Sequence, residues 1–327
     1  MRKGVGITGW LQKQWFYLGM AGVLILGYVW VRSGLWLGER SGLLVVALMF
    51  VMGLGLSPKG ILAQLRKVRA LGLFLLASYL LAPLVAWAAA WVFFRGRQDL
   101  FTGLIIVGAT ATTLSSSIVW TRLAGGNGAL ALVMSITGNS LQFLVTPTWL
   151  GLMLGASVKF NVTNMMGKLL LVVLVPVLAS QVVVVLSRER VLQWRPLTNV
   201  VARLLVLAVI WVAVSKAASD LLTTDALYSS LAVIAVHLVL LAVGWWVLGR
   251  LLAEHGDRIA LLFCGGQKTL PSSTMIATTY FAHLSAAVLP VLLYHFWQLI
   301  LDSLLLDRLN QHESIPGETE ELVSADG

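Results

Sequence analysis

Two short stretches combine hydroxyl side chains with a long apolar background. The first, at residues 113–127, reads TLSSSIVWTRLAGGN, and the second, at residues 269–283, reads TLPSSTMIATTYFAH. Ser and Thr side chains hydrogen-bond to nearby backbone groups, and Pro271 removes a backbone donor. Both features indicate an interrupted helix. Two such interruptions at matching places in the two halves of an apolar chain point to a binding site of the kind found in transporters.

The chemistry of such a site comes from the backbone as well as from side chains. A broken helix exposes unpaired N–H and C=O groups whose partial charges are about half an elementary charge. In a membrane these groups survive only if they are buried in protein or line a watery cavity. For any single serine, close packing of helices is an equally good explanation. We predict that the site is formed by Thr113, Ser115, Ser116, Ser117, Ser272 and Ser273.

A basic residue and two polar stripes accompany the interruptions. Lys268 lies at the second interruption with no acidic residue beside it in the sequence. A buried charge in a membrane usually faces a cavity or a partner, although a lysine near a helix end can extend to the interface. Two apolar segments carry polar side chains at helical spacing. Such stripes in membrane helices either line a cavity or connect helices by hydrogen bonds. These stripes are Ser135, Asn139 and Gln142, and His295, Gln298 and Asp302.

The composition identifies the elements that must position these residues. Of 327 residues, 58% are hydrophobic and 11% are charged, against about 25% charged in soluble domains. The apolar runs are continuous rather than alternating, so helices in a lipid bilayer are expected. The formal charge of +9 is better explained by basic loops than by nucleic-acid binding. Cys264 is the single cysteine, and the sequence contains no metal-ligand spacing and no catalytic motif. His237 and His283 are single imidazoles in apolar surroundings, for which a structural role is the better explanation.

The apolar runs predict ten membrane spans. Lys and Arg are twice as frequent on one side of this arrangement, 14 against 7, which predicts that both termini are cytoplasmic. We therefore expect a multi-pass plasma-membrane protein, in a bacterium an inner-membrane protein, whose first helix remains as an anchor. The acidic tail at 310–327 is expected to be disordered. The spans are predicted near 15–32, 41–57, 70–94, 100–124, 128–155, 165–187, 199–218, 226–251, 258–282 and 286–308.

The ten spans divide into two related halves, 1–160 and 161–309. A shift of 156 residues superimposes Thr113, Leu114, Ser116 and Ser117 on Thr269, Leu270, Ser272 and Ser273. The same shift superimposes Gln142 on Gln298 and Asn139 on His295. Five spans in each half place the halves in opposite orientation, as in an inverted repeat. The fold class predicted is therefore an all-α polytopic membrane protein in which the fourth and ninth helices are discontinuous and cross each other.

The same residues carry a resemblance to a known family. Residues 108–155, together with FVMGLGLSP at 50–58, YLLAPLVAW at 79–87 and FCGGQKTLPSS at 263–273, resemble the bile acid:sodium symporter family, in its SBF-like branch. The resemblance implies a panel of the first, second, sixth and seventh spans and a core of the others. It also implies organic anions as substrates.

The sodium ligands that this resemblance implies are only partly present. The Ser-Asn pair after the first interruption falls on Ser117 and Ile118, and the bridging glutamate falls on Phe263. Loss of the carboxylate removes the main charge compensation for sodium, and Lys268 could substitute for the cation. A weak sodium site would keep only three ligands, Ser117, Ser135 and Gln267, because the remaining family ligands fall on Ala131 and Ser78.

Two classes of function follow from these observations. The first is secondary active transport of a small organic anion by alternating access, with doubtful sodium coupling and with Na⁺ or H⁺ as the candidate coupling ion. The second is a membrane regulator of ion homeostasis, or a scaffold, that keeps the transporter fold. An enzyme is not expected, and neither a cofactor nor nucleic acid is expected as a partner. The oligomeric state stays open.

Overall fold

The computed structural model describes residues 7–54, 64–114, 116–155 and 161–313, and these residues fold into helices without a strand. The bounds of the first half are α1 Ile7–Val29, α2 Val31–Gly38, α3 Ser41–Leu54, α5 Val68–Leu76, η1 Ala77–Leu81, α6 Ala82–Phe93, α7 Gln98–Ala109, α8 Ser116–Leu123 and α9 Gly128–Leu154. Those of the second half are α10 Val162–Leu169, η2 Leu170–Leu174, α11 Val175–Leu186, α12 Arg188–Ala217, α13 Thr224–Ala242, η3 Val243–Leu248, η4 Gly249–Leu251, α14 His255–Gly266, α15 Leu270–Tyr280, η5 Ser285–Ala287 and α16 Val288–Glu313.

Six of the described helices are long and apolar enough to cross a membrane. A seventh span is counted if α1 and α2 are taken together, although the chain bends by 100° between them. Ser41–Leu54 and Gln98–Ala109 are shorter apolar helices. The structure therefore corrects several predicted boundaries. The predicted first span 15–32 ends in this bend, the helix predicted from 199 begins at Arg188, and residues 310–313 of the predicted tail belong to α16.

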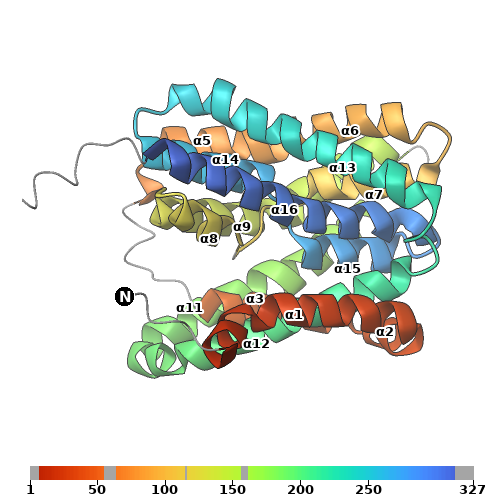
Figure 1. The fold of residues 1–327 in the computed structure, drawn as a ribbon, viewed down its shortest axis with the longest axis horizontal. Helices are drawn as coiled ribbons and strands as arrows, with labels where there is room; N and C mark the ends of the chain where they lie inside the picture. Colours follow the sequence, from red (N-terminus) through yellow and green to blue (C-terminus); the bar gives the residue numbers. More distant parts are fainter. Residues whose placement is uncertain (1–6, 55–63, 115, 156–160, 314–327) are drawn as a thin grey trace, which may run out of the picture.

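The helices pack in two layers (Figure 1). Helices α1, α2, α3, α11 and α12 contact one another and form the lower layer in this view. Helices α5, α6, α7, α8, α9, α13, α14 and α16 form the upper layer, in which α6 packs on α7 and α13 packs on α16. Helix α10 continues through η2 into α11 and contacts α9 of the upper layer. Contacts of α15 and α16 with α3 and α12 join the two layers. The first, second, sixth and seventh predicted spans thus pack as one group.

Proline shapes two of the long helices. Both α5–α6 and α10–α11 pass through a π-helical turn, and a proline, Pro83 or Pro176, is the second residue after it. In the first turn, the Ala82 N–H bonds to the Ala77 carbonyl five residues earlier. The next bond in this register would need the N–H of Pro83, which proline lacks. The carbonyl of Ser78 is therefore free to accept a bond from another part of the chain.

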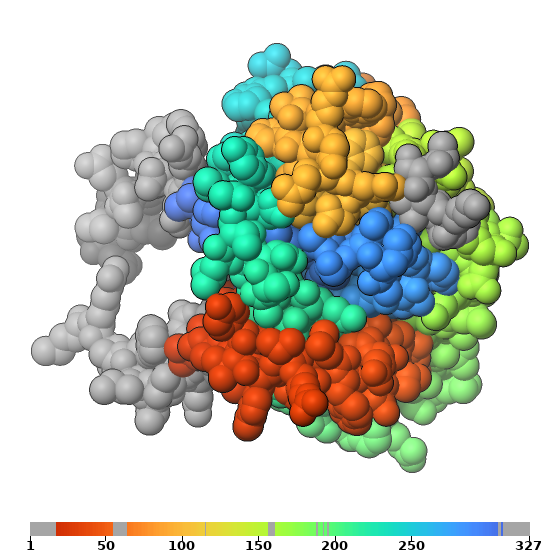
Figure 2. Space-filling view, turned by 90° about the vertical axis from the view of Figure 1, so that its right-hand side faces the viewer, coloured from red at the N-terminus to blue at the C-terminus, as the bar shows by residue number. Residues whose placement is uncertain are grey.

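Polar contacts close the molecule at both ends. Figure 2 looks at the end where the α6–α7, α12–α13 and α15–α16 connections reach the surface. Here Arg97, in the α6–α7 connection, forms an ion pair with Asp225 in the first turn of α13. At the opposite end, Lys67 Nζ contacts Glu254 at 2.6 Å and Asp257 at 2.7 Å. Because the Asn127 amide also donates to Asp257 at 2.8 Å, three connections are tied to one buried carboxylate.

Candidate functional site

The two predicted interruptions exist and touch each other. Helix α7 ends at Ala109 and α8 begins at Ser116, while α14 ends at Gly266 and α15 begins at Leu270. The Thr269 N–H donates to the Ala111 carbonyl at 2.9 Å, which joins the two stretches directly. Hydroxyl groups support the local geometry, since Thr113 Oγ1 accepts from the Ser117 N–H at 3.0 Å. Ser115, which was predicted to be part of the site, lies outside the described residues.

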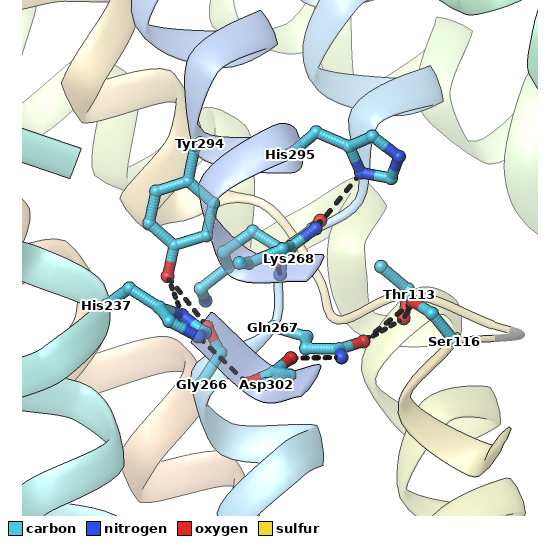
Figure 3. Close-up of polar contacts among 10 residues, drawn as sticks. Thr113, Ser116, His237, Gly266, Gln267, Lys268, Tyr294, His295 and Asp302 are labelled. Carbon is cyan, nitrogen blue, oxygen red and sulfur yellow. Dashed lines mark hydrogen bonds and ion pairs between the residues drawn. The ribbon is translucent and has the colours of Figure 1, made fainter. Parts of the chain in front are cut away.

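Gln267 links the second interruption to the first. Its Oε1 accepts hydrogen bonds from Thr113 Oγ1 and Ser116 Oγ, both at 2.7 Å (Figure 3). Its Nε2 donates to Asp302 Oδ2 on α16 at 2.5 Å. The orientation of the Gln267 amide is therefore fixed, because a carboxylate can only accept the N–H and the two hydroxyls then meet the carbonyl oxygen. Three predicted site residues come together in this cluster.

Asp302 continues the network through His237 on α13. His237 Nε2 lies 3.0 Å from Asp302 Oδ1, and His237 Nδ1 lies 3.2 Å from the Tyr294 hydroxyl (Figure 3). Tyr294 donates its only hydroxyl proton to the Gly266 carbonyl at 2.7 Å. In its contact with His237, the Tyr294 oxygen can therefore only accept, and the hydrogen comes from Nδ1 of the imidazole. Tyr294 thereby caps the carboxyl end of α14, where a free carbonyl would otherwise be buried. His237 is internally bonded, as predicted for a structural histidine, whereas His283 is exposed.

Lys268 is buried at the second interruption and bonds only to neutral oxygen atoms among the described residues. Its Nζ donates to the Ser78 carbonyl at 2.8 Å, to Ser78 Oγ at 3.3 Å and to the Thr110 carbonyl at 3.0 Å. The first carbonyl is the one that Pro83 leaves free, and the second belongs to Thr110, the residue that follows the end of α7. The ammonium thus caps two carbonyls from the first half of the chain, and all three of its protons are used.

Two polar side chains hold the non-helical backbone. Gln298 Oε1 accepts from the Lys268 N–H at 2.8 Å, and Gln298 Nε2 donates to the Lys268 carbonyl at 3.0 Å and contacts His295 Nδ1 at 3.0 Å. On α9, Asn139 Nδ2 donates to the Thr112 carbonyl at 2.9 Å. The polar stripes therefore tie helices to the interruptions, which was one of the two explanations left open by the sequence.

The remaining predicted residues occupy different places around the crossing. Ser117 Oγ donates to the Thr113 carbonyl and lies 3.1 Å from Ser135 Oγ, beside Cys264. Ser273 Oγ donates to the Thr269 carbonyl and lies 2.8 Å from the hydroxyl of Thr110. Ser272 Oγ and both polar atoms of Gln142 are buried and have no partner within the described residues.

Two of the three predicted sodium ligands lie side by side, and the third is bonded to other hydroxyl groups. Ser117 and Ser135 contact each other, but the Gln267 oxygen is already bonded to two hydroxyls. Phe263 is fully buried where the resemblance calls for a carboxylate. In the described part of the chain, no group of three or more His, Cys, Asp or Glu residues could hold a metal ion.

Several residues of the network were not among the predicted site residues. Asp302 was identified in the helical stripe with His295 and Gln298 but was not named as a site residue. The partners of Lys268 could not have been found, since they are backbone carbonyls more than 150 residues away. Sequence analysis discussed Ser78, His237 and Asp302 without naming them as site residues, and it did not single out Thr110, Thr112 and Tyr294.

Comparison with known proteins shows the family to which this chain belongs. Residues 14–311 match the family model described as the SBF-like CPA transporter family. The chain is 27% identical to sodium/bile acid cotransporter 7-B of Xenopus laevis, over 92% of this chain and 93% of the relative. It is 27% identical to sodium/bile acid cotransporter 7 of Mus musculus, over 90% and 92%, and 30% identical to an uncharacterized protein of Pseudomonas aeruginosa, over 80% and 81%. The protein is a multi-pass membrane protein that belongs to the SBF-like transporter family.

Proposed function

We propose that the protein is a secondary transporter of a small organic anion that works by alternating access around the crossing of α7–α8 and α14–α15. The observation that carries the proposal is the contact between two interrupted segments from different halves of the chain, made by Thr269 and Ala111. Helix interruptions of this type are where transporters place their substrates. Family membership supports transport, and the names of the vertebrate relatives refer to sodium and bile acid.

The electrostatics of the interruptions favour an anion. The negative ends of α7 and α14 are capped by donors, namely the Lys268 ammonium at Thr110 and the Tyr294 hydroxyl at Gly266. The positive ends of α8 and α15 carry hydroxyl and backbone groups, and among the described residues no acidic side chain follows in either first turn. Helix N-termini with free N–H groups attract anions. Ser116 and Ser272 lie at these two ends and are the candidate contacts for the solute.

The arrangement of the spans supports the rocking movement that alternating access requires. We infer ten spans in two inverted halves, with both termini cytoplasmic, in which α7–α8 and α14–α15 each count as one span. The layer of α1, α2, α3, α11 and α12 would be the panel, and the other layer would be the core. In agreement with this topology, the connections expected on the outer side reach the surface at one end of the molecule (Figure 2).

We propose further that the Lys268 ammonium takes the place of a bound cation, as a permanent or a protonatable charge. It joins the α5–α6 turn, the first interruption and the second interruption through oxygen contacts, as a coordinated cation would. Because the charge is covalently attached, the core would not depend on sodium for its cohesion. A coupling ion, if one is used, would then be a proton or none at all.

Reconstituted protein tests both statements. Proteoliposomes are loaded with buffer and given labelled organic anions, with and without a sodium gradient or a pH gradient. We expect uptake that does not require sodium and that is lost in Lys268→Met, with partial activity in Lys268→Arg as the matched control that keeps the charge. Steep sodium dependence of the wild type, or unchanged uptake by Lys268→Met, would contradict the role of Lys268. A folded protein that transports no anion under any gradient would favour the regulator or scaffold function.

A further inference from the structure

Two glutamines at corresponding places in the repeat are in different bonding states. The shift of 156 residues that superimposes Gln142 on Gln298 also superimposes Thr112 on Lys268. Gln298 holds both backbone groups of Lys268, the N–H at 2.8 Å and the carbonyl at 3.0 Å. Gln142 is fully buried on α9, yet neither its Oε1 nor its Nε2 has a partner within the described residues.

The neighbours of Gln142 on α9 show which segment it faces. Asn139, one turn earlier, donates to the Thr112 carbonyl at 2.9 Å. Thr146, one turn later, donates to the Ala109 carbonyl at 2.7 Å. Residues three and four apart share one face of a helix, so Gln142 lies between two contacts to the first interruption. It stands beside the backbone that corresponds to the segment that Gln298 holds in the other half.

A buried amide without partners is unfavourable, because it has lost the hydrogen bonds that water would provide. The present conformation therefore satisfies one glutamine of the pair and leaves the other unsatisfied. We propose that Gln142 and Gln298 are alternating clamps. In the conformation described here, Gln298 holds the second interruption at Lys268. In the opposite conformation, Gln142 holds the N–H and carbonyl of Thr112, and Gln298 releases Lys268.

The chemistry of the first interruption allows this exchange. The Thr112 carbonyl already accepts one bond from Asn139, but a carbonyl oxygen has two lone pairs and can accept a second donor. Each clamp stabilises only one of two states, so the two glutamines set the ratio of the states without contacting the solute. This inference depends on the proposed alternating access, and the experiment is designed to separate the two.

The ratio of the two states can be measured by the distance between the layers. Spin labels are placed at Leu123→Cys on α8 and Leu186→Cys on α11, two exposed positions, in a Cys264→Ala background that removes the single native cysteine. The full-length protein is studied in lipid nanodiscs by pulsed electron paramagnetic resonance. We expect Gln298→Met to move the populations toward the opposite state and Gln142→Met to move them the other way. Loss of one hydrogen bond corresponds to about a fivefold change in the ratio.

Matched variants distinguish a clamp from a merely structural residue. Gln181→Met removes a glutamine that donates to the Gly53 carbonyl away from the crossing, and it should leave the ratio unchanged. The double variant Gln142→Met/Gln298→Met should return the ratio toward that of the wild type, because the two effects oppose each other. Gln142→Ala and Gln298→Ala repeat the comparison if a Met variant does not fold.

Two results would overturn the inference in different ways. In the first, the wild type shows two distances while both single variants shift the ratio of their populations in the same direction, or leave it unchanged. In that case the proposed role of the two glutamines is wrong, but alternating access is not contradicted. If the wild type shows one distance at every pH and with every solute that it transports, alternating access itself fails, and the clamps fail with it.

Discussion

Asp257 offers the sharpest test of how burial controls the strength of an ion pair in this protein. Its side chain is 7% exposed and accepts bonds from Lys67 at 2.7 and 2.9 Å and from Asn127 at 2.8 Å. Asp257→Asn places an amide where Lys67 donates, so one charge-assisted pair is lost and two donors face each other. A hydrogen bond to a charged group contributes about 1.5–3 kcal/mol, and an exposed ion pair contributes less than about 1 kcal/mol.

The magnitude follows from the exposure of both partners. Lys67 is 26% exposed and keeps Glu254, so part of the loss is recovered. We expect Asp257→Asn to cost about 2–4 kcal/mol, which corresponds to a decrease in Tm of roughly 4–8 °C. Thermal unfolding of the detergent-solubilised protein measures this decrease. A double-mutant cycle with Lys67→Met isolates the interaction energy of the pair.

The opposite end of the molecule supplies the control. Arg97 and Asp225 likewise join the α6–α7 connection to the first turn of α13, but the arginine is 52% exposed and the aspartate 16%. Asp225→Asn should therefore cost less than about 1 kcal/mol. If Asp257→Asn destabilises the protein no more than Asp225→Asn does, or if the cycle with Lys67→Met gives no coupling, the assignment of Asp257 as the tie between three connections is wrong.

Three further predictions concern packing, charge and pH. A Cβ on Gly103 would lie 2.2 Å from the Ala287 carbonyl oxygen, so Gly103→Ala should lower Tm by several degrees, whereas Gly72→Ala, with open space around it, should not. Asp302→Leu leaves the Gln267 amide without its acceptor and His237 Nε2 without its partner, and it should cost about 3–5 kcal/mol in thermal unfolding, part of which Asp302→Leu/His237→Leu should recover. Partial burial lowers the pKa of Lys67, but hydrogen bonds and charge from Asp257 and Glu254 outweigh it and raise the pKa above the ordinary 10.5. The stabilisation that the charged Lys67 provides is therefore complete below pH 10.5 and is lost as the pH rises through the raised pKa. Above pH 10.5, Tm should therefore fall less steeply in Lys67→Met than in the wild type.

The sequence by itself determined the class of the protein and the places where its helices break. Continuous apolar segments with few charges can satisfy their backbone in lipid only as helices. The interruptions were predictable because Pro271 and the clustered hydroxyls act on the backbone within a few residues of themselves. The family resemblance was carried by the same stretches, and the matching residues 14–311 show that it covers nearly the whole chain.

Only the tertiary structure decided which groups meet at the crossing. From the sequence, Lys268 could have faced a cavity or the interface. In the structure it bonds to Ser78, whose carbonyl Pro83 leaves free, and to Thr110 at the end of α7. Gln142 and Gln298 have the same residue type and corresponding positions, yet only Gln298 is bonded. The physical reason is that hydrogen bonds are short-ranged and directional, so a residue's partner depends on how helices far apart in the sequence are packed. Sequence pattern specifies the donors and acceptors, and packing decides which of them pair.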